Sequence, residues 1–260
     1  MSVLRAGFRI AGAIGIAMLF LPFQVISVAC GSRLAQRIPV LIHRNLLRII
    51  GVRVITRGQA PGKVPALVVS NHVSWLDILV IGSLQPLSFI AKAEVAQWPA
   101  LGRLAKLHGT IFIDRQRRTA TVEVNDIISR RLADGEAIVL FPEGTTGDGN
   151  RMLPFRSSLI GAAQAALTRE NTGGNQIELR PLAVSYIRRN GLPVTRRERP
   201  EIAWYGDMEL APHLWALLRE GPLDVAVQWG EPIMLDTTND RKSATLRAQA
   251  IIRQSLRQAG

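Results

Sequence analysis

The sequence predicts an α/β domain with a central sheet flanked by helices, preceded by an N-terminal helical segment attached to a membrane. Short runs rich in β-branched residues alternate with helical patterns after about residue 50, and this alternation is typical of α/β domains. Before it, 23 consecutive residues between Arg9 and Arg33 carry no charge. We therefore expect a membrane-associated helical segment over residues 1–50 and a second domain over residues 51–260.

The uncharged run is long enough to cross a membrane, which takes roughly 20 apolar residues. Pro22 lies in its middle and predicts a kink or a break in the helix. Apolar and basic residues alternate over 38–50, which predicts an amphipathic stretch at the interface. Spanning the membrane and entering one leaflet both remain open, and a cleaved signal peptide or a buried core helix are the alternatives. Arginines stand on both sides of the run and give no orientation signal: Arg5, Arg9, Arg33, Arg37, Arg44 and Arg48.

Within the second domain, the patterns predict a series of strands and helices. The expected strands are 66–70, 87–91, 109–114, 137–141, 179–186 and 223–229. The expected helices are 75–82, 99–107, 119–134, 157–168, 211–220 and 240–258. The third of these helices ends at Asp134-Gly135, a common C-terminal signal, and the last is typical of a surface helix. The stretches 171–175 and 189–200 are rich in turn formers and charge, so we expect exposed loops there.

The chain is strongly basic, with a formal net charge of +12. Nucleic acid, an anionic membrane surface, or an acidic substrate or carrier protein would each explain such a charge. The basic residues are scattered and match no zinc, helix-turn-helix or ribonucleoprotein pattern, so nucleic acid is not expected as a partner. With an apolar N-terminal segment in the same chain, the charges suit anionic lipid head groups better.

Other classes of chemistry are disfavoured because the chain lacks their motifs. The chain contains no G-x-S-x-G, no phosphate-binding loop of the G-x-x-x-x-G-K type and no G-x-G-x-x-G. Its four histidines lie too far apart for a local metal motif, so no metal is expected. The single cysteine, Cys30, has no partner for an internal disulfide.

The stretch SNHVSWLDILV, residues 70–80, brings a histidine near a carboxylate. On one straight helix His72 and Asp77 would point about 140° away from each other. They meet if His72 lies in the turn before a helix and Asp77 in its first turn. Ser74 is a good N-cap residue with Asp77 three positions later, which supports that arrangement. A helix cap alone would explain the pattern; the functional interpretation is a general base oriented by a carboxylate, acting on a hydroxyl that the substrate brings.

Two further clusters carry polar groups at strand ends. The strand expected over 137–141 leads into Phe-Pro-Glu-Gly-Thr, which is either a simple exit turn or a ligand-binding edge of the sheet. Glu143, Gly144 and Thr145 would present a carboxylate and backbone N–H groups there. The strand in GTIFIDR ends at Arg115, which is placed to meet an anion.

Taken together, these blocks resemble the signature of the glycerolipid acyltransferase family. They read N-H-x-x-x-x-D, G-x-x-F-I-x-R and F-P-E-G-T in this order, followed by a strand that carries Pro181. The similarity covers roughly residues 45–235, and the four blocks in order are specific although each alone is weak.

The resemblance implies transfer of a fatty acyl group from an acyl carrier protein or coenzyme A thioester to the hydroxyl of a membrane lysolipid. It gives His72 the role of general base and Asp77 that of its orienting partner. Arg115 and Glu143 would bind the acceptor, with Gly144 and Thr145 shaping that site. No cofactor is implied beyond the thioester co-substrate. The family's α/β core and N-terminal attachment to one leaflet also imply a place at the cytoplasmic face of a bacterial inner membrane.

One departure bears on the acceptor. Family members that use phosphatidate precursors commonly read F-P-E-G-T-R, whereas Thr146 stands at the arginine position here. The variant form is similar to bacterial enzymes that acylate lyso-ornithine lipid, whose head group carries a carboxylate in place of a phosphate. We therefore expect lyso-ornithine lipid as acceptor. The alternatives are 1-acylglycerol-3-phosphate, with Arg115, Arg151 or Arg156 compensating, and an inactive membrane-anchored lipid-binding module.

Overall fold

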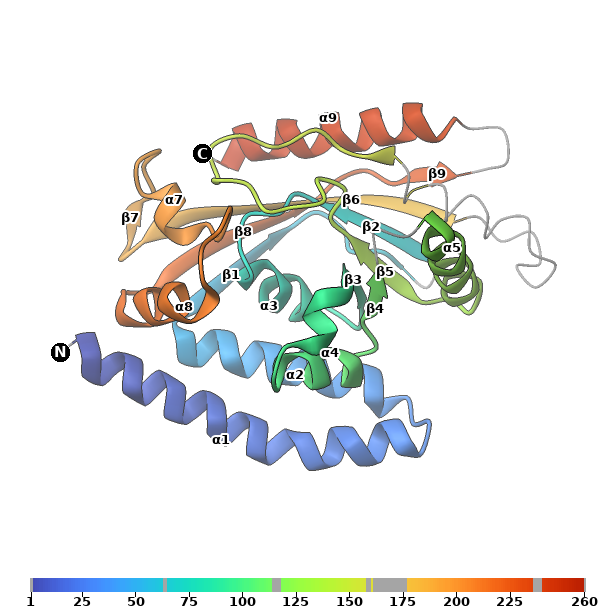
Figure 1. Cartoon of the computed structure of the whole chain (residues 1–260). Helices are drawn as coiled ribbons and strands as arrows, with labels where there is room; N and C mark the ends of the chain where they lie inside the picture. The colour runs from blue at the N-terminus through green and yellow to red at the C-terminus, as the bar shows by residue number, and fades with distance from the viewer. Residues whose placement is uncertain are drawn as a thin grey trace.

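The computed structural model describes residues 2–62, 65–113, 118–157, 160, 177–235 and 240–259. A mixed sheet forms its centre, with helices on both faces (Figure 1). The described strands run in the order β1-β8-β6-β2-β5-β3-β4, and β7 and β9 pair with β6. The predicted α/β fold with a central sheet flanked by helices is therefore confirmed.

The strands are β1 Val52–Arg57, β2 Ala66–Ser70, β3 Ser88–Lys92, β4 Ile111–Ile113, β5 Ala137–Leu140, β6 Ile177–Arg189, β7 Leu192–Pro193, β8 Leu223–Trp229 and β9 Ile233–Leu235. The helices are α1 Ser2–Ala29, α2 Leu34–Ile50, α3 Leu76–Gly82, the 3-10 helix Ala93–Gln97, α4 Leu101–Leu107, α5 Arg118–Ala133, α7 Arg199–Ile202, α8 Leu210–Arg219 and α9 Arg241–Ala259. The predicted strands are all present, two of them with the predicted bounds (66–70 and 223–229) and the other four with shifted ends. The elements β1, β7, β9, α7 and the 3-10 helix were not predicted. Most of the helix predicted over 157–168 lies outside the described residues.

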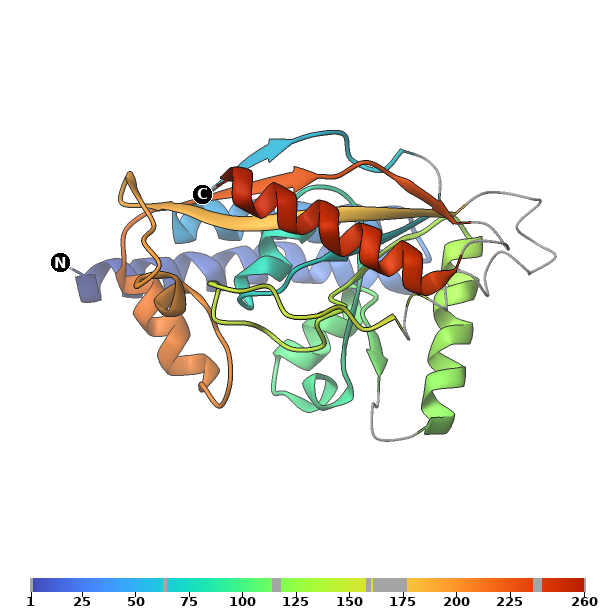
Figure 2. The same cartoon turned by 90° about the horizontal axis from the view of Figure 1, so that it is seen from above.

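Strand β2 lies in the middle of the sheet and is buried on both faces. It pairs in parallel with β5 on one side and with β6 on the other. Leu67 and Val69 point into a core shared with α5 and α9, while Val68 points into a second core shared with α2, α3 and α8. This alternation is what the two-residue period of a strand requires between two helical layers. Figure 2 shows α9 lying across the sheet on the first of these faces.

Strand β6 holds the parallel and antiparallel parts of the sheet together. Its first half pairs with β2 and β9, and its second half pairs antiparallel with β8. Pro181 lies in the first half and is in register with Val69 of β2. The same strand therefore places its later residues beyond the end of β2, where the loop that carries His72 begins.

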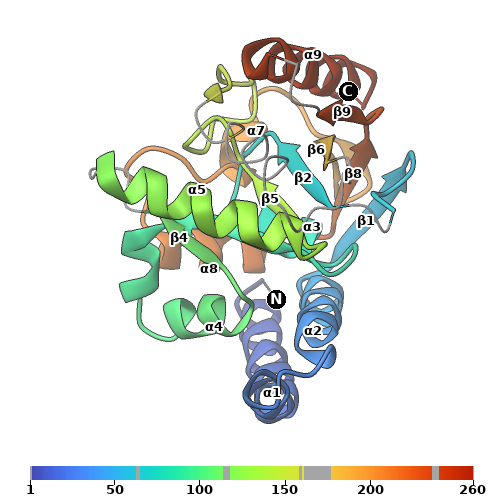
Figure 3. The same cartoon turned by 90° about the vertical axis from the view of Figure 1, so that its right-hand side faces the viewer.

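Helices α1 and α2 form a hairpin beneath the second helical layer, with α1 farthest from the sheet (Figure 3). Both ends of α1 are bonded to the α/β domain. Arg9 donates to the carbonyls of Leu218 (2.9 Å) and Glu220 (2.8 Å) at the end of α8, and Arg5 also donates to Glu220 (3.1 Å). At the other end the buried Gln24 donates to the Leu107 carbonyl at 2.7 Å. Helix α1 thus lies along the domain, and the division into domains 1–50 and 51–260 stays a prediction.

The outer face of α1 is apolar and exposed. Phe8 is 85% exposed and Leu4 is 78% exposed, and other large apolar side chains continue the face: Val3, Ile14, Met18, Leu19, Phe23, Val25, Ile26 and Val28. Among the described residues, α1 is the one helix long and apolar enough to cross a membrane. The helix continues through Pro22, so the predicted break is absent. Because α1 is docked lengthwise, its geometry suits a helix lying in one leaflet, as amphipathic membrane helices do.

Two histidines are packed together where α2 meets α4. The rings of His43 and His108 lie edge to face with centroids 5.0 Å apart. Burial lowers the pKa of His43 to about 4, and burial together with the neighbouring His43 lowers the pKa of His108 to about 3. In the unfolded chain each takes up a proton near pH 6.5, so folding stability is lost as the pH falls from about 7 towards 4.

We expect replacement of both histidines by asparagine to flatten this pH dependence. On going from pH 7.5 to pH 5.5, each native histidine should lower the free energy of unfolding by about 1.4 kcal/mol. The double variant lacks this loss, so over the same pH change its free energy of unfolding should rise by roughly 2 to 3 kcal/mol relative to that of the native chain. Urea unfolding at both pH values measures the gain. The native chain and the variant are compared because Glu143 also changes stability with pH. Burial raises its pKa to about 7, so its contribution to stability is lost as the pH rises, opposite to the effect of the histidines, and it is the same in both chains. Parallel stability curves for the two chains would contradict the prediction.

Candidate active site

The loop predicted to be catalytic, residues 71–75, starts where β2 ends, and the side chain of Asn71 fixes that start. Its amide nitrogen donates to the Val184 carbonyl at 3.0 Å, and its amide oxygen accepts the Val184 N–H at 2.9 Å. This pair of hydrogen bonds continues the β2–β6 ladder by one step with a side chain in place of backbone. The residue that precedes His72 is therefore held to the sheet, and the chain is free to turn after it.

The carboxylate of Asp77 is the centre of the loop. It is fully buried, and its Oδ2 accepts hydrogen bonds from the backbone N–H groups of Val73 (2.7 Å) and Ser74 (3.0 Å). The same oxygen lies 2.9 Å from His72 Nδ1. The other oxygen, Oδ1, accepts the hydroxyl of Tyr186 at 2.6 Å. The structure therefore brings together the two residues that the sequence predicted as a catalytic pair.

These contacts assign the tautomer of His72. Backbone N–H groups can only donate, and burial together with the nearby Asp77 charge raises the pKa of Tyr186 well above 10, so its hydroxyl keeps its proton. Asp77 is thus surrounded by donors, which stabilise its charged form. His72 Nδ1 then carries a proton toward Asp77, and Nε2 is left with the lone pair that a general base needs.

Only half of the predicted capping box at Ser74 is present: Asp77 accepts the Ser74 N–H, but the Ser74 side chain caps no N–H group that the structure describes. Its hydroxyl is buried and has no hydrogen-bond partner among the described residues, and α3 begins two residues later, at Leu76. The capping is done by Asp77, which reaches back to the N–H groups of Val73 and Ser74. One carboxylate therefore both ends the loop and orients the histidine, and the turn-then-helix arrangement that the sequence predicted is present.

The carboxylate of Glu143 ties three segments together. It is 4% exposed; Oε1 accepts the N–H of His72 and Oε2 accepts the N–H of Leu153, each at 2.9 Å. Burial raises the pKa of Glu143 to about 7, these two N–H groups lower it, and the charge of Asp77 raises it further. Both oxygens are engaged by backbone donors, so the geometry makes Glu143 a positioning residue for the catalytic loop. Its predicted part in acceptor binding stays a prediction.

The turn after β5 wraps around the same loop. Gly144 has φ +79°, a left-handed conformation that favours glycine, and the N–H of Gly147 donates to the His72 carbonyl at 2.9 Å. The Phe141 ring stacks on the imidazole, with centroids 3.9 Å apart. Thr145 is exposed. Arg115 lies outside the described residues, so its predicted role, like the shaping role of Gly144 and Thr145, stays a prediction.

Two contacts beyond the predicted motifs hold the loop from the opposite side. The indole N–H of Trp75 donates to Nδ1 of His213 in α8 at 3.0 Å. The backbone N–H of Trp204 donates to the Val73 carbonyl at 2.9 Å. The sequence did not indicate these contacts or that of Tyr186, because they join segments more than 100 residues apart. The register of β2 against β6 is the signal that could have found Tyr186.

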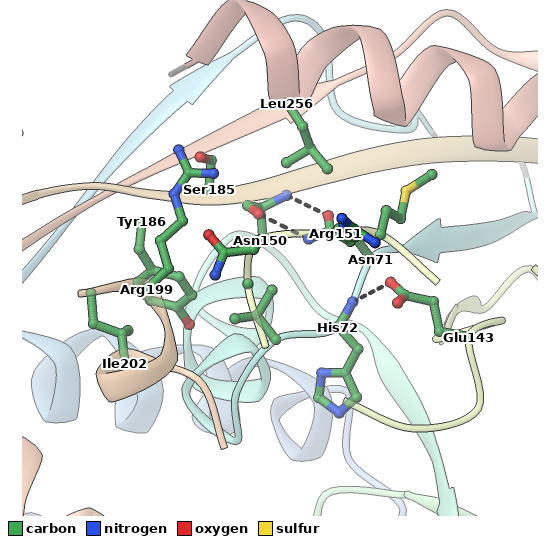
Figure 4. Close-up of a pocket in the computed structure, with 14 residues that line it drawn as sticks. Asn71, His72, Glu143, Asn150, Arg151, Ser185, Tyr186, Arg199, Ile202 and Leu256 are labelled. Atoms are coloured by element: carbon green, nitrogen blue, oxygen red, sulfur yellow. Dashed lines mark hydrogen bonds between the residues drawn. The ribbon is translucent and has the colours of Figure 1, made fainter. Parts of the chain in front are cut away.

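A small cavity lies beside this loop (Figure 4). Its volume is about 90 Å³, and its lining includes Asn150, Arg151 and Arg199. The imidazole of His72 points away from these side chains in Figure 4, so the cavity lies behind the reacting ring. It has room for a few water molecules or a small anion and is too small for an acyl chain. Among the described residues, no three histidine, cysteine, aspartate or glutamate side chains are placed to hold a metal ion.

The fold and the site together define a class: an α/β protein in which a histidine contacts a buried carboxylate at the end of a central strand, with an apolar helical hairpin on one side. A family model described as "Acyltransferase" matches residues 43–185, which include the His72–Asp77 loop and the turn at Glu143. The chain belongs to this acyltransferase family.

Two relatives and one solved structure extend this finding. The lyso-ornithine lipid O-acyltransferase of Brucella abortus is 40% identical over 98% of this chain and 95% of its own. The 1-acyl-sn-glycerol-3-phosphate acyltransferase of Neisseria gonorrhoeae is 34% identical over 63% of this chain and 58% of its own. The crystal structure of the 1-acyl-sn-glycerophosphate acyltransferase of Thermotoga maritima has the same fold, with a TM-score of 0.67 at 18% identity, covering 99% of this chain and 97% of that one. With the exposed apolar helix α1, the family indicates an enzyme associated with membranes and their lipids.

Replacing Asp77 by asparagine should reduce kcat by a factor on the order of 10³ to 10⁴, because the amide places a donor where only acceptors fit and favours the wrong tautomer of His72. Replacing Tyr186 by phenylalanine removes one of the donors to Asp77 and should lower kcat only about tenfold. Steady-state kinetics of the two purified variants, with folding checked by circular dichroism, test the order of these effects. Near-normal turnover of Asp77→Asn would mean that Asp77 serves only as a helix cap.

Replacing Glu143 by alanine leaves two backbone N–H groups without acceptors, so we expect a loss of about 1 to 3 kcal/mol in stability for each. The displaced catalytic loop should lower kcat about 100-fold while KM changes less than about threefold. Glu143→Gln is the matched control, since its amide oxygen can still accept one of the two N–H groups. A rise in KM at unchanged kcat would instead favour direct acceptor binding by Glu143.

Proposed function

We propose that the protein transfers a fatty acyl group from an acyl carrier protein or coenzyme A thioester to the hydroxyl of lyso-ornithine lipid, forming ornithine lipid. The single observation that supports the chemistry best is the 2.9 Å contact between His72 Nδ1 and the buried Asp77. It leaves Nε2 free to take a proton, which is what an alcohol needs to become a nucleophile.

In the proposed reaction, His72 Nε2 removes the proton of the acceptor hydroxyl as its oxygen attacks the thioester carbonyl. The new C–O bond forms first, and collapse of the tetrahedral intermediate breaks the C–S bond. The imidazolium then returns its proton to the leaving thiolate. Asp77 stabilises the imidazolium and keeps the ring oriented, and no cofactor is required.

Two observations support lyso-ornithine lipid as the acceptor. The identity to the Brucella abortus lyso-ornithine lipid O-acyltransferase extends over nearly the whole of both chains. Thr146 stands where family members that act on phosphatidate precursors commonly carry an arginine. The competing acceptor is 1-acylglycerol-3-phosphate, which the name of the Neisseria gonorrhoeae relative favours. The intact His72–Asp77 pair argues against an inactive lipid-binding module.

The proposed location is the cytoplasmic face of a bacterial inner membrane. The thioester donors are cytoplasmic, and the acceptor lies in the lipid leaflet. The imidazole of His72 stacks on Phe141, which belongs to the core on the α2, α3 and α8 side of the sheet. The base thus opens toward the layer beneath which α1 lies, a suitable side for a substrate that arrives from the membrane.

We expect the purified enzyme to turn over lyso-ornithine lipid at least about tenfold faster than 1-acylglycerol-3-phosphate, a selectivity of about 1.4 kcal/mol. The assay offers each acceptor with both donors, acyl carrier protein thioester and coenzyme A thioester, in matched detergent micelles. His72→Ala is the control and should abolish transfer to either acceptor while the protein stays folded. Faster turnover of the lysophosphatidate would overturn the acceptor, and substantial turnover by His72→Ala would overturn the base.

A further inference from the structure

The N-terminal part of the chain carries most of the protein's net charge. Residues 1–76 contain nine arginine or lysine residues and no aspartate or glutamate, so nine of the twelve net positive charges lie there. Four of them form one row along α2, the arginine row: Arg33, Arg37, Arg44 and Arg48. With 100° per residue, the four side chains lie within about 60° of one another, and the row is about 22 Å long.

The arginine row is exposed and has no carboxylate partner among the described residues. All four side chains face solvent, and among the described residues no carboxylate forms an ion pair with any of them. Arg44 donates to the carbonyls of Ser83 (2.7 Å) and Leu84 (3.1 Å), which orients its guanidinium and leaves the charge in place. Arg53, in the neighbouring strand β1, differs because it forms two hydrogen bonds to Asp224.

The position of α2 sets the depth of the row. Helix α2 lies between α1 and the sheet in Figures 1 and 3, and packed helices lie about 8 to 10 Å apart. An in-plane helix buries its apolar face about 5 to 10 Å into the boundary between head groups and acyl chains. With the outer face of α1 at that depth, the adjacent helix lies at the level of the lipid head groups.

A groove beside the row adds room for a ligand. It lies open between α2 and β1, and its volume is about 530 Å³. Arg44, Arg48 and Arg53 line it together with apolar side chains of Leu47, Leu84 and Trp229. A guanidinium fork binds a phosphate through two parallel hydrogen bonds, and arginine stems cover apolar surface while the charge stays in water.

We propose that the arginine row binds the phosphate groups of anionic phospholipids, so that attachment of the protein to a membrane depends on anionic lipid. An acidic carrier protein would also be attracted by these charges. The lipid surface fits better because α2, which carries the row, packs against α1, whose other side is the exposed apolar face. A leaflet that takes up the outer face of α1 then reaches α2 with its head groups. This inference concerns attachment and is independent of the acceptor.

The test is a competition between two kinds of vesicle. Purified full chain is mixed with equal amounts of phosphatidylcholine vesicles and of phosphatidylcholine vesicles that contain a quarter phosphatidylglycerol, the detergent is removed, and the two kinds are separated by density. The native chain should favour the anionic vesicles. In the variant Arg33→Gln, Arg37→Gln, Arg48→Gln the preference should fall about fivefold for each arginine removed, hence about 100-fold. Arg44 is left unchanged because it also bonds to the end of α3.

The matched control removes the same charge from the opposite face of the sheet, through Arg247→Gln, Arg253→Gln and Arg257→Gln on the exposed side of α9. It should keep the native preference, and an equal loss would mean that total charge alone acts. An even distribution of the native chain, or an unchanged preference in the α2 variant, would overturn the proposal. A variant that keeps its vesicle preference and loses turnover with acyl carrier protein but not with coenzyme A thioester would assign the row to the carrier protein instead. Acyl transfer in micelles confirms that each variant is folded.

Discussion

Four hydrogen-bond donors converge on one buried carboxylate, and the geometry of the site depends on this convergence. Asp77 has no exposed surface, so each donor must be in place before its charge can be accommodated. Two donors come from the loop backbone, one from His72 and one from Tyr186 on β6. The last donor is available only if β6 pairs with β2 in the observed register. The central sheet therefore does more than support the loop, because its pairing supplies part of the carboxylate's environment.

The same loop is held from every neighbouring segment. From the turn after β5, Glu143 accepts the backbone N–H of His72. The Asn71 side chain bonds to Val184 in the sheet, and the Trp75 indole donates to His213 in α8. Helix α8 in turn accepts the arginines at the start of α1 through its last carbonyls. A continuous set of contacts thus runs from the helix with the exposed apolar face to the loop that carries His72. This arrangement fixes the orientation of the imidazole relative to the exposed apolar face of α1, which suits the proposed reaction between a water-soluble thioester and a lipid.

The sequence predicted the parts of the site that depend on local spacing and missed those that depend on strand register. His72 and Asp77 could be paired from a five-residue separation, because only a turn followed by a helix lets them meet. Ser74 was assigned the cap because its residue type fits, but α3 begins later and the carboxylate of Asp77 takes that role. Tyr186 lay in a predicted strand without any local sign of its partner, 109 residues away. Strand β9 was missed since it has only three residues, whereas β1 was missed although it has six; both depend on pairing with strands far away in the sequence, β6 and β8.

The central claim is that Asp77 holds a proton on His72 Nδ1 and leaves Nε2 free to act as a base. Nitrogen-15 NMR of the histidine side chains in detergent micelles tests this directly, with His72→Gln used to assign the signals. The account predicts that near pH 8 the His72 ring shows a protonated Nδ1 and an unprotonated Nε2, and that Asp77→Asn shifts the population toward the other tautomer. A native ring protonated at Nε2 and bare at Nδ1 would contradict it.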